Sequence, residues 1–168
     1  MNLISLPSTT ACTEALCCLL VETVSDGASL GFIPPLSRDR AKMYWDTVNE
    51  GISSGKKELL CSFDTDGLTG AVQLVFSLCD NALHRVEVKK LMVLPSKRKQ
   101  GIGRQLMTFL EERAVAMEKK LIILSTRSGD PASALYQSMG YICAGKIPRA
   151  TIDAKGNYDD TVFFYKEL

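Results

Sequence analysis

The most informative stretch of this chain is residues Leu91–Gly103, with the sequence L-M-V-L-P-S-K-R-K-Q-G-I-G. Its apolar start is typical of a strand, which ends at Pro95 because proline cannot donate a hydrogen bond to a neighbouring strand. Gly101 and Gly103 follow where an amphipathic helix begins, so backbone N–H groups there are not obstructed by side chains. The pattern predicts a strand, a cationic loop and a helix N-terminus that together can bind an anion.

Three cations, Lys97–Lys99, add positive charge beside that helix N-terminus and favour a ligand that carries several phosphates. A solvated, flexible turn would use the same residues, so this stretch alone leaves both interpretations open. A dinucleotide-binding loop would have a third glycine where Leu106 stands. A nucleotide-hydrolase loop would have Lys-Ser or Lys-Thr where Arg104 and Gln105 stand, so neither of these loop types is expected.

The rest of the chain predicts two helices, an antiparallel meander and then a strand–helix crossover. We expect an α/β fold with a mixed, largely antiparallel sheet and helices on both faces, in a single domain of residues 1–168. Expected helices are Thr10–Thr23, Ser37–Asn49 with Ser37 as N-cap, Gly103–Met117, and one that opens at Asp130 or Pro131. Expected strands are Leu59–Phe63, Leu68–Leu78 after an Asp64–Gly67 turn, Arg85–Leu94, Leu121–Leu124, Tyr141–Ile147 and Val162–Tyr165.

The composition is that of an ordinary globular protein, with 168 residues, 46% hydrophobic and 23% charged. A formal net charge of +1 provides no positive field for nucleic acid, so no such partner is expected. Without an apolar run of roughly 20 residues or an export-signal pattern, we expect a cytoplasmic protein with no membrane partner. Six irregularly spaced cysteines and the single His84 predict reduced thiols and no metal site.

Two motifs resemble a known family. Arg98–Gly103 matches the R/Q-x-x-G-x-G/A signature of the GNAT superfamily of N-acetyltransferases, and it follows a strand as it does in that family. Ala132–Tyr141, with the sequence A-S-A-L-Y-Q-S-M-G-Y, is similar to the family's tyrosine-bearing helix and the Gly-aromatic pair that opens the next strand. Within the superfamily, Glu22–Phe32 and Arg85–Pro95 are similar to the tabtoxin-resistance acetyltransferases.

The resemblance implies the GNAT fold, in which the strands equivalent to Arg85–Leu94 and Leu121–Leu124 splay apart. Acetyl-CoA, as co-substrate, would place its pantetheine arm in the gap, where a ligand substitutes for a missing strand. The implied reaction is direct transfer of acetyl to a primary amine of a small molecule, such as an amino-acid-like toxin or antibiotic, which would confer resistance. Implied cofactor-binding residues are Leu91, Met92, Val93, Arg98, Lys99, Gln100, Gly101, Ile102, Gly103 and Arg104.

Two side chains are candidates for the proton transfers of such a reaction. Period-two alternation places Glu87 on the opposite sheet face from Val86 and Val88, where a carboxylate can act as a base or form a cross-strand salt bridge. The family position favours the base. Tyr136 stands at the family's general-acid position, where a phenol near the sulfur can donate its proton, although core packing would also explain an aromatic residue there.

By family analogy, the acceptor pocket involves the loop around Ser29 and the second helix. Candidate substrate-binding residues are Ser29, Phe32, Trp45, Gln73 and Ser125. Trp45 and Phe32 also fit a core, and Gln73 fits a solvated strand face. Two positions depart from the family pattern. Gly129 replaces an asparagine that binds pantetheine in many members, and Ser125 replaces an acidic residue of the tabtoxin-resistance group.

Three other interpretations stay open. One is an N-acetyltransferase that acts on a peptide or protein, which would need a more open groove. Another is a non-catalytic acyl-CoA-binding sensor, which would need neither Glu87 nor Tyr136. A third concerns assembly, because an exposed edge at Val162–Tyr165 would favour pairing into a homodimer.

Overall fold

The computed structural model describes residues 2–168, and its strands form one seven-stranded sheet in the order β1-β2-β3-β4-β5-β7-β6. In this described part of the chain, β4 and β5 pair in parallel and the other neighbours pair antiparallel. The strands are β1 (Asn2–Leu6), β2 (Lys57–Asp64), β3 (Gly67–Phe76), β4 (Arg85–Val93), β5 (Leu121–Arg127), β6 (Ile142–Ile152) and β7 (Tyr158–Glu167). The helices are α1 (Thr13–Ser25), α2 (Arg38–Ser53), α3 (Ile102–Ala116) and α4 (Pro131–Ser138).

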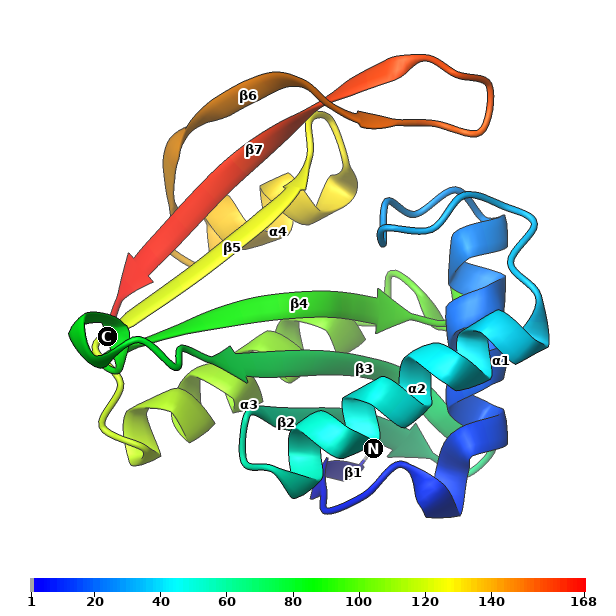
Figure 1. The fold of residues 1–168 in the computed structure, drawn as a ribbon, viewed down its shortest axis with the longest axis horizontal. Helices are drawn as coiled ribbons and strands as arrows, with labels where there is room; N and C mark the ends of the chain where they lie inside the picture. Colours follow the sequence, from blue (N-terminus) through cyan, green and yellow to red (C-terminus); the bar gives the residue numbers. More distant parts are fainter. Residues whose placement is uncertain (1) are drawn as a thin grey trace.

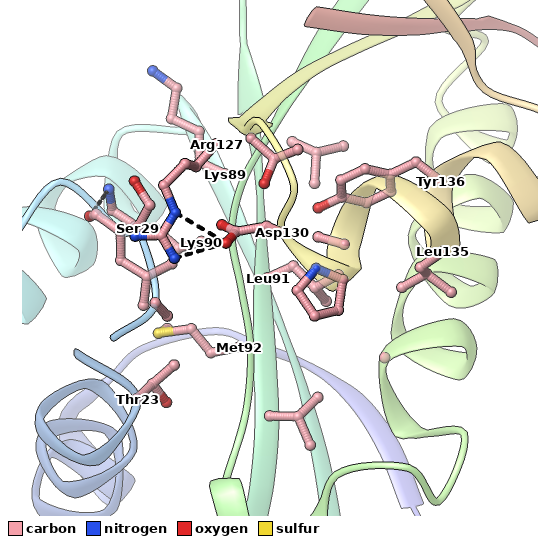
Figure 2. A pocket seen from close by; sticks show the side chains of 18 of the residues that line it. Thr23, Ser29, Lys89, Lys90, Leu91, Met92, Arg127, Asp130, Leu135 and Tyr136 are labelled. Atoms are coloured by element: carbon pink, nitrogen blue, oxygen red, sulfur yellow. Dashed lines mark hydrogen bonds and ion pairs between the residues drawn. The ribbon is translucent and has the colours of Figure 1, made fainter. Parts of the chain in front are cut away.

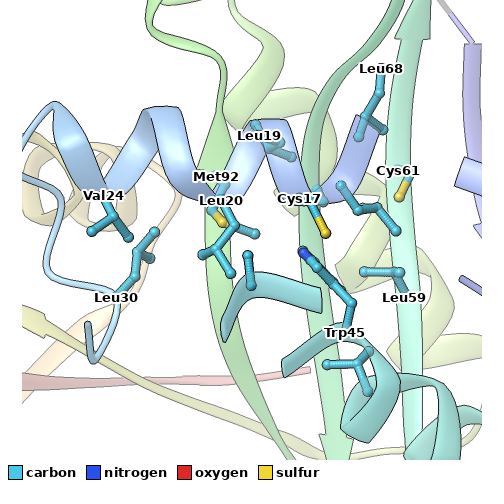
Figure 3. Packing of buried hydrophobic residues seen from close by; sticks show 14 of the residues in the cluster. Cys17, Leu19, Leu20, Val24, Leu30, Trp45, Leu59, Cys61, Leu68 and Met92 are labelled. Atoms are coloured by element: carbon cyan, nitrogen blue, oxygen red, sulfur yellow. The ribbon is translucent and has the colours of Figure 1, made fainter. Parts of the chain in front are cut away.

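Helices cover both faces of the sheet, as the sequence predicts. Helices α1 and α2 lie over one face and α3 and α4 over the other (Figure 1). Trp45, Leu20 and Met92 belong to the core on the α1–α2 side (Figure 3), whereas Leu106 and Val88 belong to the core on the α3 side. The mixed α/β architecture is therefore confirmed.

The start of α2 also agrees with the sequence. The Ser37 hydroxyl accepts a hydrogen bond from the backbone N–H of Arg40 at 3.3 Å, which satisfies one of the free donors at the helix N-terminus. At its C-terminal end, α2 continues to Ser53, one turn beyond the expected end at Asn49. The first helix begins as a 3-10 turn at Thr10–Cys12 and becomes α-helical at Thr13.

The central strands diverge, as the family resemblance implies. β4 and β5 pair only from Arg85–Glu87 to Leu121–Ile123, and beyond these residues they separate (Figure 1). The β5 edge of β4 after Glu87 therefore has no strand partner within residues 2–168. This gap is the feature that positions the candidate site.

A bulge in β4 lies beside the gap, and sequence alternation did not predict it. Gln73 pairs with Lys89 and Ala71 pairs with Met92, so two residues of β4 oppose the single residue between Ala71 and Gln73. One of the two is Lys90, whose φ of 56° lies in the left-handed region that non-glycine residues rarely adopt.

The largest differences from the strands expected from the sequence are in β1, β6 and β7. β1 was not predicted, because its five residues form a short, partly exposed edge strand with little periodicity. β6 continues past Pro148 to Ile152, which an edge strand tolerates because proline there need not donate to a second neighbour. β7 begins at Tyr158 rather than Val162.

Within the described residues, no helix is both long and apolar enough to span a membrane.

Candidate active site

A cleft of about 950 Å³ occupies the gap between β4 and β5. Its walls come from the α1–α2 loop, the second half of β4, the loop before α3, the end of β5 and the start of α4. Figure 2 shows Ser29, Lys89, Lys90 and Arg127 on one side of β4, with Tyr136 and Leu135 on the opposite side. The cleft therefore runs through the sheet and is reached from both faces.

The cleft ends at a cradle of backbone amides before α3. The first hydrogen bond of that helix runs from the N–H of Gln105 to the carbonyl of Gly101 at 3.1 Å. Within residues 2–168, the N–H groups of residues 99–104 donate to no protein acceptor. Gly101 adopts a φ of 82° as the N-cap, which turns the chain into the helix. Free amides at the N-terminus of a 15-residue helix form a binding site for an anion such as a pyrophosphate.

The cations near the cradle differ in their availability. Lys97 pairs with Asp64 and Asp66 at 2.7 Å each, and these hydrogen bonds raise the pKa of Lys97 to about 12. Arg98 forms an ion pair with Asp26 at the end of α1. Lys99 forms no ion pair with the described residues. Lys97 thus has a structural partner, whereas Lys99 is free to contact a phosphate.

The predicted cofactor residues converge on this part of the cleft. Nine of them line it, namely Leu91, Met92, Val93, Arg98, Lys99, Gly101, Ile102, Gly103 and Arg104. Gln100 does not line the cleft, and its side chain is exposed. Its contribution to the cradle is therefore limited to its free backbone N–H. The guanidinium of Arg104 donates to the Ser138 hydroxyl at 2.6 Å, which ties the start of α3 to the end of α4.

Glu87 lies in the cleft on the face opposite Val86 and Val88, which are buried against α3. Its carboxylate forms an ion pair with Lys89 at 3.1 Å, and the side chains are 38% and 46% exposed, respectively. The partner is thus two residues away on the same strand, not across the sheet. Glu87 is accessible from the cleft, and the pair is too exposed to contribute much to stability.

Tyr136 reaches the cleft from α4, and its hydroxyl points toward the space between the strands (Figure 2). The ring is 5% exposed and packs at 5.7 Å from the Tyr141 ring and 5.9 Å from the Phe164 ring, between ring centres. Burial, followed by the nearby charge of Asp130, raises the pKa of Tyr136 to about 12. The phenol therefore remains protonated at neutral pH, the form in which it can donate.

Arg127 forms a connection across the cleft that sequence analysis missed. Its guanidinium donates to Asp130 at 2.7 and 3.0 Å and to the backbone carbonyl of Gly27 at 3.0 Å. It also lies 3.7 Å from a carboxylate oxygen of Asp159. The side chain joins the end of β5 to the start of α4 and to the α1–α2 loop. A single arginine in a polar stretch gave no sequence signal for these distant partners.

Comparison with known proteins agrees with this geometry. A family model described as an acetyltransferase (GNAT) domain matches residues 57–143. The chain belongs to the GNAT acetyltransferase family. The matched residues include β4, the amide cradle, α3, β5 and α4. They therefore contain Glu87 and Tyr136 of this GNAT chain.

Solved structures share the fold at low sequence identity. A ribosomal-protein-alanine N-acetyltransferase from Brucella melitensis has a TM-score of 0.84 and 20% identity, with 100% of both chains covered. A phosphinothricin acetyltransferase from Sinorhizobium meliloti, solved with acetyl-CoA, has a TM-score of 0.81 and 20% identity, with 100% of this chain and 89% of that chain covered. A Salmonella typhimurium protein solved with its cofactor acetyl-CoA has a TM-score of 0.79 and 19% identity, with coverage of 100% and 95%.

The GNAT cleft includes only part of the predicted substrate set. Ser29 and Ser125 line it, whereas Phe32, Trp45 and Gln73 do not. Trp45 is 0% exposed within the core between α1, α2 and the sheet. Gln73 is 1% exposed and donates to the Tyr44 hydroxyl at 2.7 Å.

Phe32 packs edge-on against the same tyrosine, with 5.4 Å between ring centres. The side chains of Phe32, Trp45 and Gln73 therefore contribute to the packing of α2. The expectation that they contact an acceptor is withdrawn.

Proposed function

We propose that this chain is an acetyl-CoA-dependent N-acetyltransferase that transfers acetyl directly to a primary amine of a small molecule, acting as a single acetyltransferase domain. One observation carries the proposal. A cradle of free backbone amides and two side chains suited to proton transfer, Glu87 and Tyr136, line one continuous cleft. A sensor that only binds acyl-CoA would need the cradle alone.

The residues present fit acetyl-CoA as co-substrate. The free amides of residues 99–104, with Lys99 beside them, suit the pyrophosphate. The unpaired edge of β4 at Leu91–Val93 lines the cleft and offers backbone groups to the amides of a pantetheine arm. Gly129 provides no side-chain amide for this arm, so its recognition rests on the backbone. When bound, acetyl-CoA supplies the activated acetyl group as a thioester.

The proton transfers are assigned to two residues on opposite sides of β4. Glu87 accepts a proton from the acceptor ammonium, directly or through water, which frees the nitrogen lone pair. That nitrogen forms the new amide bond to the acetyl carbon as the carbon–sulfur bond breaks, and it then releases its second proton to solvent. Tyr136 donates its proton to the departing sulfur, because burial keeps the phenol protonated. A backbone N–H of Leu91–Val93 can stabilise the negative charge on the carbonyl oxygen.

The acceptor end of the cleft favours a small molecule over a peptide. The loop of residues 26–31 lines this end, and Arg127 fastens it to the end of β5 through the Gly27 carbonyl. A loop fastened across this end suits a compact amine better than a continuous chain. With the likeness to the tabtoxin-resistance acetyltransferases, this supports an amino-acid-like toxin or antibiotic as the acceptor and resistance as the biological role.

The test is a thiol-release assay with acetyl-CoA and a panel of amines, combined with calorimetric binding of acetyl-CoA. The panel contains amino acids, β-lactam amino acids, aminoglycosides, polyamines and short peptides. We expect acetyl-CoA binding and turnover with a small amino acid. Turnover only with peptides would replace the proposed acceptor class. Binding without any turnover would indicate a sensor, and no binding would contradict the amide cradle.

Two expectations from the sequence stay predictions, the cytoplasmic location and the homodimer. The expected edge at Val162–Tyr165 is wrong, because β7 pairs with β5 on one side and with β6 on the other. An edge strand of the sheet is instead β6, whose residues are all exposed, including Ile142, Ile147 and Ile152. Such an edge favours pairing with a second copy. Light scattering of the wild-type chain and of Ile147→Lys tests this, with a dimer expected for the first and a monomer for the second. A wild-type monomer would contradict the prediction.

A further inference from the structure

The ammonium group of Lys90 is a cation without an anionic partner at the acceptor end of the cleft. Among residues 2–168, its only hydrogen bond is to the backbone carbonyl of Leu30, at 2.5 Å, and it forms no salt bridge. It also lies 5.7 Å from the centre of the Phe32 ring and 5.8 Å from that of Tyr44. An ammonium has three donors, so the carbonyl leaves donor capacity unused.

The environment of Lys90 makes this lack of a partner costly. Burial lowers the pKa of Lys90, and the like charges of Lys89 and Lys57 lower it further, while Glu87 opposes the shift. Glu87 itself pairs with Lys89 at 3.1 Å. A partly buried charge is ordinarily compensated by an opposite charge, and no described residue provides one for Lys90.

The backbone at this position is also unfavourable for a lysine. Lys90 occupies the bulge of β4 with a φ of 56°, a conformation that glycine adopts at much lower cost. Residues held in such conformations cluster at functional sites, where the surrounding structure enforces them. Here the bulge aims the lysine at the α1–α2 loop and immediately precedes Leu91, which lines the same cleft.

The other cations of the cleft are already engaged or belong to the phosphate end. Arg127 is bound to Asp130, Lys89 to Glu87 and Arg98 to Asp26. Lys99 lies at the amide cradle. Lys90 is therefore the unneutralised cation at the acceptor end of the described cleft.

We propose that Lys90 binds a carboxylate of the acceptor. The acceptors would then be amino acids and close analogues, which are small molecules that carry both an amine and a carboxylate. The proposal rests on the proposed function. A carboxylate would accept a charge-assisted hydrogen bond from the Lys90 ammonium and supply the missing negative charge. Polyamines and aminoglycosides, which bring only further positive charge, would be repelled by Lys90. A peptide N-terminus lacks a carboxylate next to its amine.

The experiment compares amino acids with their α-carboxamides in the thiol-release assay, for the wild-type chain and for Lys90→Gln and Lys90→Met. The carboxamides keep the amine and the side chain but lose the negative charge. For the wild type, we expect kcat/KM to be about 10- to 100-fold lower for the carboxamide than for the acid, the range of a hydrogen bond to a charged group. In Lys90→Gln, kcat/KM should fall by a similar factor for the acid and change little for the carboxamide.

This pairing separates recognition from structure. Lys90 also holds the loop through the Leu30 carbonyl, and a purely structural role would lower kcat/KM equally for the acid and the carboxamide. Lys90→Gln keeps a donor for that carbonyl, whereas Lys90→Met removes it. Lys42→Met, at an exposed position on α2, serves as a matched control for the loss of a lysine.

The possible outcomes are distinct. Turnover with equal efficiency for acids and carboxamides would overturn the role of Lys90 and leave the proposed N-acetyltransferase standing. An equal loss for both substrates in Lys90→Gln would do the same. An absence of turnover with every amine would instead contradict the proposed function, and the assignment of Lys90 along with it.

Discussion

Asp26 and Arg98 form an ion pair that joins the end of α1 to the loop leading into α3. One residue after Asp26, the carbonyl of Gly27 accepts a hydrogen bond from Arg127 at 3.0 Å. The α1–α2 loop is thus joined to both sides of the cleft by adjacent residues. Asp26 joins it to the cradle side, and Gly27 joins it to the end of β5. Both arginines are held by the loop that borders the acceptor end.

Asp26→Asn should strengthen acetyl-CoA binding at low ionic strength, by about 2- to 5-fold, because it removes a negative charge beside the cradle and frees Arg98. The two side chains are 45% and 40% exposed, so the variant should lose less than about 1 kcal/mol of unfolding free energy. Calorimetric titration at two salt concentrations measures the effect. Asp80→Asn, at an exposed position in the loop before β4, is the control, and equal behaviour of the two variants would contradict the prediction.

Tyr136→Phe should lower kcat by about 10²- to 10⁴-fold while acetyl-CoA binding stays unchanged, because the ring packing is kept and only the proton donor is lost. A phenol donates below its pKa, and the pKa of Tyr136 is raised to about 12. The wild type should therefore lose no activity through this residue as the pH rises from 7 to 10. Tyr158→Phe, at an exposed tyrosine, controls for removal of a hydroxyl. Full turnover in Tyr136→Phe would remove the assigned acid.

Glu87→Gln should lower kcat by about 10²-fold or more if the carboxylate acts as the base. Its thermal midpoint should change little, because the ion pair with Lys89 is half-exposed. Lys89→Gln breaks the same pair from the other side. If the two variants lose the same activity, Glu87 acts only through the pair; if the loss is confined to Glu87→Gln, the base assignment stands. Steady-state kinetics and thermal melts of both variants decide between these outcomes.

The two glycines of the cradle should respond to alanine in opposite ways. Gly101 has a φ of 82°, so Gly101→Ala should cost about 1–2 kcal/mol of unfolding free energy and weaken acetyl-CoA binding. At Gly103 an added Cβ would meet Leu135 at 3.5 Å and Val93 at 3.8 Å, which are ordinary contacts. Gly103→Ala should therefore be neutral or stabilising, by up to about 1 kcal/mol from helix propensity. Denaturant unfolding measures both, and equal destabilisation would contradict the assignment.

Trp45→Phe should reduce stability by about 1–2 kcal/mol and leave the KM for the acceptor unchanged. The smaller ring leaves a cavity in a fully buried position, but it also removes an indole N–H that has no hydrogen-bond partner among the described residues. A clear rise in the acceptor KM, with unchanged KM for acetyl-CoA, would return Trp45 to the substrate pocket. Kinetics measured below the melting transition separate a change in the acceptor KM from the loss of stability.

The sequence predicts the cradle and the placement of Glu87 because both depend on local rules. Gly101 and Gly103 specify the turn into a helix, and alternation with Val86 and Val88 specifies the face of Glu87. The bulge at Lys90 was not predictable from these rules, because two successive lysines fit a regular strand equally well. Only the register of β3 against β4 reveals the extra residue.

Long-range contacts explain the other differences. Arg127 and Gly27 are 100 residues apart in sequence, and no local pattern indicates that they meet. Trp45 and Gln73 were expected at the acceptor by analogy, but the packing of α2 on the sheet buries both. The strand expected at Tyr141–Ile147 continues past Pro148 to Ile152, because β6 lies at an edge of the sheet.

The separation of β4 from β5 means that this protein carries an incomplete sheet in its interior. Amide hydrogens on the β5 edge of β4 beyond Glu87 border the cleft, and no neighbouring strand of the described residues accepts from them. They should exchange with deuterated solvent faster than those shared with β3, and slow down when a ligand occupies the gap. Hydrogen exchange along a single strand would then report occupancy of the cleft residue by residue, without any catalytic turnover.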